Sequence, residues 1–166
     1  DAAAQYKIAR VPAIAVTRVE SPKLLVTGNE QPRERDYGIR YYGVPAGYEF
    51  AALVGDIFDV SAGESGLTTQ TKTALQQLKK PLHLQVFTTP TCPHCPRAVR
   101  LAHKMAMESE WVTADALDAS EYPELAERYQ VYGVPLTVAN NTTRVEGGMP
   151  EPMFVEQILQ GIGIEP

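Results

Sequence analysis

The chain has 166 residues, 44% of them hydrophobic and 21% charged, as expected for one folded domain or for two small units that share a core. Twenty acidic and fifteen basic side chains give a net charge of −5, and no basic stripe is present, which argues against a nucleic-acid partner. No apolar stretch approaches the ~18 residues of a membrane span, so no membrane partner is expected. Two cysteines are too few for a disulfide-stapled scaffold.

Residues 1–60 carry the signals of a β-hairpin followed by a helix. Residues 13–16 and 37–45 match β-rich runs that occur later in the chain, and Phe50 to Ile57 is expected to be helical. Residues 21–36, rich in Glu, Arg, Pro, Gly and Asn, are predicted to form a long solvated hairpin loop. Four tyrosines are expected to pack at the junction with the following unit: Tyr37, Tyr41, Tyr42 and Tyr48.

Residues 61–80 are predicted to be a connector with a polar helix from Gln70 to Lys80. A complete unit is expected from 81 to 166. Its first strand is the apolar run at 82–87, which lies between two prolines. After a short loop, Cys92 occupies a helix N-cap position and Pro93 the favoured first helical position.

The complete unit continues with alternating helix and strand signals. We expect a helix through Met105, a strand from Trp111 to Leu117, a short helix from Tyr122 to Tyr129, and two strands that flank Asn140-Asn141. Asn tolerates a positive φ, so this dipeptide favours a hairpin turn. A final helix ends at Gly161. The predicted order is β-α-β-α-β-β-α, a mixed sheet flanked by helices.

The two regions repeat one another around a Val-Pro pair. Val11-Pro12 aligns with Val134-Pro135, and the hairpin and helix that follow each pair also align. Only eleven residues precede Pro12, too few for the strand, helix and strand that precede Pro135. We therefore interpret the chain as the C-terminal piece of a two-unit protein. A homodimer formed through the partial unit, 1–60, is a further prediction.

The two cysteines stand as Cys92-Pro93-His94-Cys95, a spacing suited to reversible disulfide exchange. A thiol at a helix start lies near unsatisfied N–H groups and the positive end of the helix dipole, which favours its thiolate. Cys95, one helical turn inward, would resolve the mixed disulfide. His94 can donate a hydrogen bond or carry positive charge beside the sulfur, and so tune the thiol.

The strand, the Thr-Pro-Thr-Cys-Pro-His-Cys segment, the helix and the later Val-Pro pair closely resemble the thioredoxin/glutaredoxin superfamily. The chain is most similar to the two-unit protein disulfide oxidoreductases of thermophilic archaea and bacteria. The resemblance implies an α/β thioredoxin-like fold and a cis proline at Pro135, with the backbone of Val134 offered to a substrate strand. It implies these site residues: Cys92 and Cys95 as catalytic, Pro93 and His94 as redox-tuning, Thr91, Val134, Pro135 and Gly147 as substrate-binding, and Pro12 as a structural cis proline.

This sequence departs from the pattern in three ways. The first unit's own dithiol is absent. Val86 stands where thioredoxins carry a buried Asp, so no proton acceptor for Cys95 is identified. Cys-Pro-His-Cys also matches the periplasmic disulfide-forming enzymes, but the 39 residues between Cys95 and Pro135 leave no room for their helical insertion.

The sequence thus predicts a cytoplasmic thiol–disulfide oxidoreductase that reduces, forms or isomerises protein disulfides without a cofactor or metal beyond its own dithiol. Expected partners are protein disulfides or dithiols, a thioredoxin-reductase-like flavoprotein, or a peroxiredoxin. One alternative is an electron-relay domain, because the chain also resembles the N-terminal domain of the alkyl hydroperoxide reductase flavoprotein. Another is an iron–sulfur or metal-binding module, for which only three histidines could supplement the cysteines. One of them, His103, is expected at the helix surface.

Overall fold

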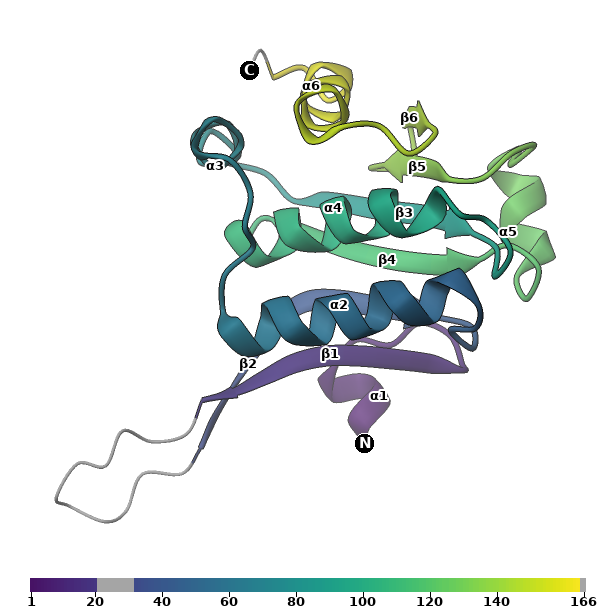
Figure 1. Ribbon diagram of the computed structural model, residues 1–166, viewed down its shortest axis with the longest axis horizontal. Coiled ribbons are helices and arrows are strands. Elements are labelled where there is room, and N and C mark those ends of the chain that lie inside the picture. Colours follow the sequence, from purple (N-terminus) through teal and green to yellow (C-terminus); the bar gives the residue numbers. More distant parts are fainter. Residues whose placement is uncertain (21–31, 165–166) are drawn as a thin grey trace, which may run out of the picture.

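The computed structural model describes residues 1–20 and 32–164, which contain one mixed six-stranded sheet of order β1-β2-β4-β3-β5-β6 (Figure 1). The strands are β1 (Ala13–Glu20), β2 (Arg33–Tyr42), β3 (Leu82–Thr88), β4 (Val112–Asp118), β5 (Leu136–Ala139) and β6 (Thr143–Glu146). The pairs β2–β4 and β3–β4 are parallel, and the other three are antiparallel. The predicted α/β class with a mixed sheet is confirmed.

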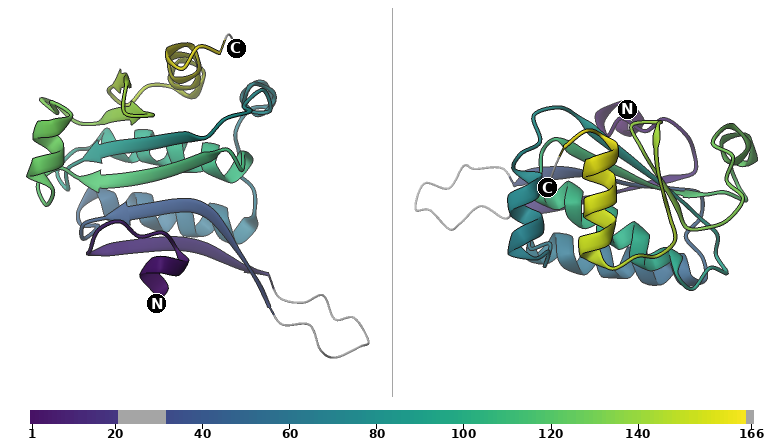
Figure 2. Two further views of the ribbon diagram at one scale, coloured as in Figure 1. Left: turned by 180° about the vertical axis from the view of Figure 1, so that it is seen from behind. Right: turned by 90° about the horizontal axis from the view of Figure 1, so that it is seen from above.

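The helices of the described residues are α1 (Ala2–Gln5), α2 (Tyr48–Ala62), α3 (Thr69–Leu75), α4 (Cys95–Glu108), α5 (Pro123–Arg128) and α6 (Glu151–Gly161). Helices α2 and α4 lie side by side across one face of the sheet, and the view from behind shows the strands in front of them (Figures 1 and 2). None of these helices is both long and apolar enough to cross a bilayer.

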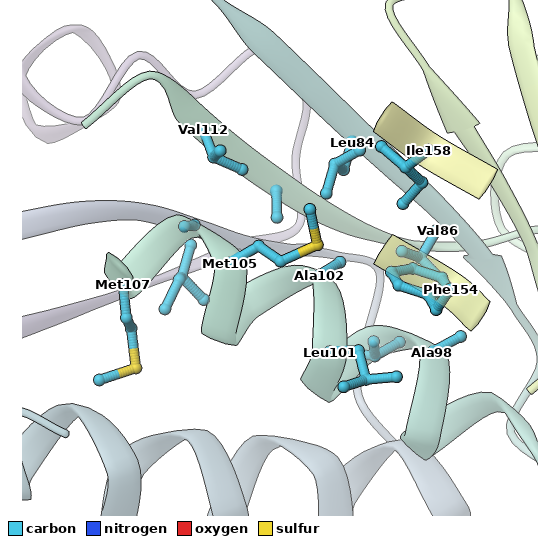
Figure 3. Packing of buried hydrophobic residues seen from close by; sticks show 14 of the residues in the cluster. Leu84, Val86, Ala98, Leu101, Ala102, Met105, Met107, Val112, Phe154 and Ile158 are labelled. Atoms are coloured by element: carbon cyan, nitrogen blue, oxygen red, sulfur yellow. The ribbon is translucent and has the colours of Figure 1, made fainter. Parts of the chain in front are cut away.

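The complete unit has the predicted order, β3-α4-β4-α5-β5-β6-α6. Asn140 and Asn141 have φ values of 47° and 63°, as the predicted hairpin turn between β5 and β6 requires. Helix α4 buries an apolar stripe against the sheet and against α6, formed by Ala98, Leu101, Ala102 and Met105 (Figure 3).

The partial unit extends the sheet of the complete unit. Strand β2 lies parallel to β4, with Ile39 opposite Ala114 and Tyr42 opposite Leu117. Three of the four tyrosines predicted at the junction are buried. The prediction is wrong for Tyr48, whose residue surface is 49% exposed because it begins α2 at the rim of the sheet.

Two predicted boundaries are also wrong. Residues 33–36 belong to β2 rather than to a loop, because they pair with residues 17–20 of β1 in an antiparallel ribbon that projects beyond the core. Of the other residues in the predicted hairpin loop, 21–31 lie outside the described residues. The connector helix spans only Thr69–Leu75, because Leu75 and Leu78 turn into the core and the chain then leads directly to β3.

Candidate redox site

Cys92 and Cys95 form a disulfide between the carboxyl end of β3 and the start of α4, with their Cα atoms 5.5 Å apart. The helix begins at Cys95 with His94 as N-cap, two residues later than predicted. Pro96 explains the difference, because it lacks the N–H that an interior helical position requires. Because the helix begins at Cys95, Pro96 lies in its first turn, where a backbone N–H has no partner within the helix and its absence costs nothing.

The two sulfurs differ in burial as the sequence predicted for an attacking and a resolving thiol. Cys92 is 7% exposed and Cys95 is fully buried. The backbone N–H of Cys95 donates a hydrogen bond of 3.1 Å to the Cys92 sulfur. The Cys92 sulfur also lies 3.7 Å from the carbonyl oxygen of Val134, so the predicted substrate-binding backbone reaches the dithiol.

The peptide bonds before Pro135 and Pro12 are both cis, as predicted. Beside the first, the N–H of Gly147 donates a 2.9 Å hydrogen bond to the carbonyl of Pro135. A cavity of about 510 Å³ opens here, lined by Tyr132, Gly133, Val134, Pro135, Leu136, Arg144, Glu146 and Gly147. Three predicted substrate-binding residues therefore share one groove next to the disulfide.

The remaining predicted residues of this group surround the disulfide. Thr91, Pro93 and His94 are exposed on the loop that carries Cys92. The β6–α6 connection approaches this loop so closely that a Cβ atom on Gly148 would lie 2.7 Å from the carbonyl oxygen of His94. The absence of a side chain at Gly148 thus allows the β6–α6 connection to pack against the loop that carries Cys92.

Pro12 lies away from the dithiol, since β2, β4 and β3 separate β1 from β5 in the sheet. Its carbonyl accepts hydrogen bonds from the N–H of Gly43 and the hydroxyl of Tyr122. These contacts connect the partial unit to the complete unit, in agreement with the predicted structural role.

Glu49 is a candidate functional residue that the sequence analysis missed. It lies in the first turn of α2, is 6% exposed, and accepts a hydrogen bond from the hydroxyl of Thr88 at the end of β3. Burial, together with the negative charges of Asp118 and Glu121, raises the pKa of Glu49 to about 7. A buried carboxyl group that titrates near neutral pH and contacts the end of β3 is suited to proton transfer.

Helix α2 begins directly against the loop that leads to Cys92. The N–H of Tyr48 donates a 3.0 Å hydrogen bond to the carbonyl of Pro90. Gly47 has a φ of 55°, and a Cβ there would lie 2.3 Å from the same carbonyl oxygen, so glycine permits this contact. The partial unit therefore delivers Glu49 to the dithiol end of the sheet.

The repeat contained a signal for Glu49. When the alignment of Pro45 with Pro150 is continued for four residues, Glu49 stands opposite Phe154. Phe154 is fully buried in the core below α6. The partial unit therefore has a carboxyl group where the complete unit has a buried phenylalanine. A polar residue at a core position of this kind is typical of functional sites.

His103 corrects another prediction. It is fully buried rather than at the helix surface, because α2 of the partial unit covers that side of α4. The helical pattern of α4 alone cannot reveal a neighbour contributed by another unit. Within residues 1–20 and 32–164, no group of three or more His, Cys, Asp or Glu side chains is arranged to hold a metal ion.

Comparison with known proteins agrees with this geometry. A family model described as a thioredoxin domain matches residues 82–160. The thioredoxin of Methanocaldococcus jannaschii is 33% identical over 76 residues, which cover 45% of this chain and 89% of that protein.

Two further relatives match across both units. A protein disulfide oxidoreductase from Aeropyrum pernix has 31% identity and a TM-score of 0.78, covering 99% of this chain and 66% of that one. The alkyl hydroperoxide reductase of Pseudomonas aeruginosa has a subunit that is 26% identical over 127 residues, or 76% of this chain. The match spans only 24% of that protein's own length. Both resemblances predicted from the sequence are confirmed, and the chain belongs to the thioredoxin superfamily.

Proposed function

We propose that this protein is a thiol–disulfide oxidoreductase that exchanges electrons between its Cys92–Cys95 pair and disulfides or dithiols of other proteins. One observation carries the proposal: the disulfide of a thioredoxin-type unit contacts the carbonyl of Val134, which lines a groove whose backbone can pair with an extended chain. The related Aeropyrum protein is described as a protein disulfide oxidoreductase.

In the reducing direction, the Cys92 thiolate attacks one sulfur of a substrate disulfide. The substrate S–S bond breaks, a mixed disulfide forms, and the first substrate thiolate leaves and takes up a proton. Cys95 then loses its proton and attacks the Cys92 sulfur. The second substrate thiolate leaves, and the enzyme dithiol has lost two electrons to become the disulfide. Disulfide formation runs through the same steps in reverse.

The start of α4 supports the first step. Cys92 precedes the helix, and the N–H of Cys95 already points at its sulfur. Such a donor, together with the positive end of the helix dipole, stabilises a thiolate. Pro93 and His94 tune this thiolate in the proposal, because they occupy the exposed turn between the two sulfurs.

Glu49 supports the second step. Cys95 is fully buried, so water cannot readily accept its proton. Glu49 is the buried carboxyl whose raised pKa of about 7 suits a proton acceptor at neutral pH. We assign it the role that the buried Asp plays in thioredoxins, since Val86 occupies that position of β3 here.

The groove supports binding of an extended substrate segment. Its lining includes the peptide units of Val134 and Gly147, and Thr91 stands exposed on the adjacent loop. Arg144 and Glu146 of β6 and Tyr132 of the segment before β5 complete the lining, and none of these three was predicted from the sequence. Arg144 donates hydrogen bonds to the carbonyls of Tyr129 and Gln130, which holds the segment that leads to Val134.

The alternative function, an electron-relay domain, would use the same thiol–disulfide chemistry and differs only in the partner protein. The relative from alkyl hydroperoxide reductase matches 76% of this chain, both units included. We propose that a flavoprotein reductase or a peroxiredoxin exchanges electrons with Cys92. The proposed reaction uses the protein's own disulfide and involves no other cofactor.

We further propose a cytoplasmic location, because both cysteines serve the redox pair and none remains for a structural disulfide. Contact between two copies through the partial unit stays a prediction. The exposed apolar side chains of Phe50, Ile57 and Phe58 on α2 support it. Light scattering over a concentration series tests this contact, and a constant monomer mass would contradict it.

A redox titration of the Cys92–Cys95 pair against glutathione and dithiothreitol buffers tests the proposed function. We expect one reversible two-electron transition, accompanied by reduction of insulin when dithiothreitol supplies electrons. If no reversible disulfide forms within the chain, the proposal is wrong. Visible absorbance or metal retained after desalting would then favour the cluster-binding or metal-binding alternative.

A further inference from the structure

A buried polar network joins the two units below the redox site. His103 of α4, Asp56 of α2 and Tyr41 of β2 are all buried. The Nδ1 atom of His103 lies 2.6 Å from Oδ2 of Asp56, and the hydroxyl of Tyr41 donates to the same oxygen. The two rings meet edge to face with centroids 5.0 Å apart. Buried polar groups are costly unless paired, so this network favours one arrangement of the helices.

The hydrogen bonds define the proton positions. Nε2 of His103 is buried without a partner among the described residues. The carboxylate oxygen of Asp56 can only accept, so Nδ1 of His103 carries the hydrogen of this contact. Burial raises the pKa of Tyr41, so its hydroxyl remains a donor.

The network fixes how α2 and α4 are aligned along their axes. Three contacts show that α2 runs parallel to α4 and the loop before it. They join Tyr48 to Pro90, Asp56 to His103, and Asp59 to Lys104. Asp56 is seven residues after Glu49, and His103 is eight residues after Cys95. At ~1.5 Å per residue, these two spacings along the helix axes differ by about one residue's rise. Because Asp56 and His103 are in contact, Glu49 and Cys95 lie at about the same height along the two helices.

We propose that His103 and Asp56 are positioning residues that hold Glu49 at the height of Cys95. This inference rests on the proposed function of Glu49 as proton acceptor. A displacement of about 1 Å in a reacting group can cost up to ~100-fold in rate, so the alignment of the two helices matters for proton transfer.

The neighbouring ion pairs are less suited to this role. Arg100 and Lys104 reach Asp59 at 2.5 Å and 3.7 Å, and all three side chains are partly exposed. Long side chains can follow a sliding helix and still keep their contact, and exposed pairs contribute little. The short imidazole–carboxylate contact, packed against Tyr41, leaves no such freedom.

The test compares His103→Leu with His103→Asn, whose amide N–H can replace Nδ1–H. The readouts are the disulfide exchange rate against pH and the titration of both thiols by thiolate absorbance in the reduced protein. We expect about a tenfold lower rate at pH 7 for His103→Leu and a change in the Cys95 titration. We expect His103→Asn to stay within about twofold of wild type. Lys104→Gln is the matched control on the same face, and we expect it to change neither readout.

A double-substitution cycle separates positioning from general loss of structure. In a Glu49→Gln background, His103→Leu should lower the rate no further, because the group that it positions is already absent. An equal loss in both backgrounds, or an unchanged Cys95 titration in folded His103→Leu, would overturn the inference. If His103→Leu does not fold, Asp56→Asn undergoes the same cycle. A wild-type protein without exchange activity would instead contradict the proposed function, and the thiol titration would still decide the inference.

Discussion

The two halves of this molecule share one plan but differ in what they do with it. Each contains a Val-Pro pair in cis, a β-hairpin, and a glycine whose N–H bonds to the proline carbonyl: Gly43 to Pro12 and Gly147 to Pro135. Only the complete unit has a dithiol beside its proline. The partial unit adds a buried carboxyl group at a position where its counterpart buries phenylalanine.

The difference arises from where each hairpin sits in the sheet. Strand β6 is an edge strand, so the groove beside it is open to a substrate. Strand β2 lies inside the sheet, next to β4, so α2 packs against α4 of the complete unit as well as against β1 of its own unit. In the proposed mechanism, the partial unit thus contributes Glu49 to the site of the complete unit.

Loss of the dithiol, which only the complete unit has, should change activity the most. Cys92→Ser should abolish exchange, because no attacking sulfur remains. Cys95→Ser should instead trap a mixed disulfide with substrate, because the resolving sulfur is absent. Non-reducing electrophoresis and mass spectrometry distinguish the two outcomes. Full exchange by the Cys92→Ser variant would contradict the mechanism.

The next substitution tests the carboxyl group of the partial unit. Glu49→Gln keeps an acceptor for Thr88 but cannot take a proton, so we expect about a 100-fold slower exchange at pH 7. The wild-type rate should also rise through about pH 7, the raised pKa of Glu49, and the variant should lack this inflection. Glu151→Gln, in the first turn of α6, is the matched control. A profile shared by all three proteins would exclude Glu49 as the proton acceptor.

The same substitution has a stability signature with a definite sign. The pKa of Glu49 is raised by folding from 4.5 to about 7, so the folded state binds its proton more tightly than the unfolded state does. The resulting stabilisation is present below about pH 4.5 and is lost as pH rises through about 7. At pH 8, Glu49→Gln should therefore be more stable than wild type by about 1–3 kcal/mol. Urea unfolding at pH 4 and pH 8 measures this difference, and an equal effect at both pH values would contradict it.

Two glycines, one in each unit, test how the units divide their roles. Gly148→Ala adds a Cβ 2.7 Å from the His94 carbonyl, which should shift the dithiol loop and slow exchange about tenfold. Gly43→Ala places a side chain at a φ of 101° and 2.9 Å from Cβ of Asp118. This strain should cost about 1–2 kcal/mol of stability and leave exchange largely intact. Similar losses of activity in both variants would show that the two units do not divide these roles.

A milder change is expected at the groove beside the edge strand. Arg144→Gln removes the guanidinium that holds the carbonyls before Val134. We expect about a threefold higher KM for a protein disulfide and an unchanged rate with a small aromatic disulfide, which does not need the groove. Steady-state kinetics with both substrates provides the measurement. Equal changes for both would place the effect of Arg144 at the dithiol.

Local sequence signals were sufficient to define the complete unit. The Cys92–Cys95 pair and the order of strands and helices depend on spacing and on turn residues, which act within a few positions of the chain, whereas the cis Pro135 was predicted from the resemblance to thioredoxins. The repeat likewise predicted the second cis proline and the hairpin of the partial unit. The start of α4 was misplaced because the predicted boundary did not take account of Pro96.

The contribution of the partial unit, in contrast, depends on how the chain packs in three dimensions. The burial of His103, its contact with Asp56 and the contact of Glu49 with Thr88 all require β2 to pair with β4. That pairing joins residues 75 positions apart, such as Ile39 and Ala114, and no local pattern encodes such a contact. Burial is a property of two surfaces, whereas the periodicity of one helix reports only its own apolar face.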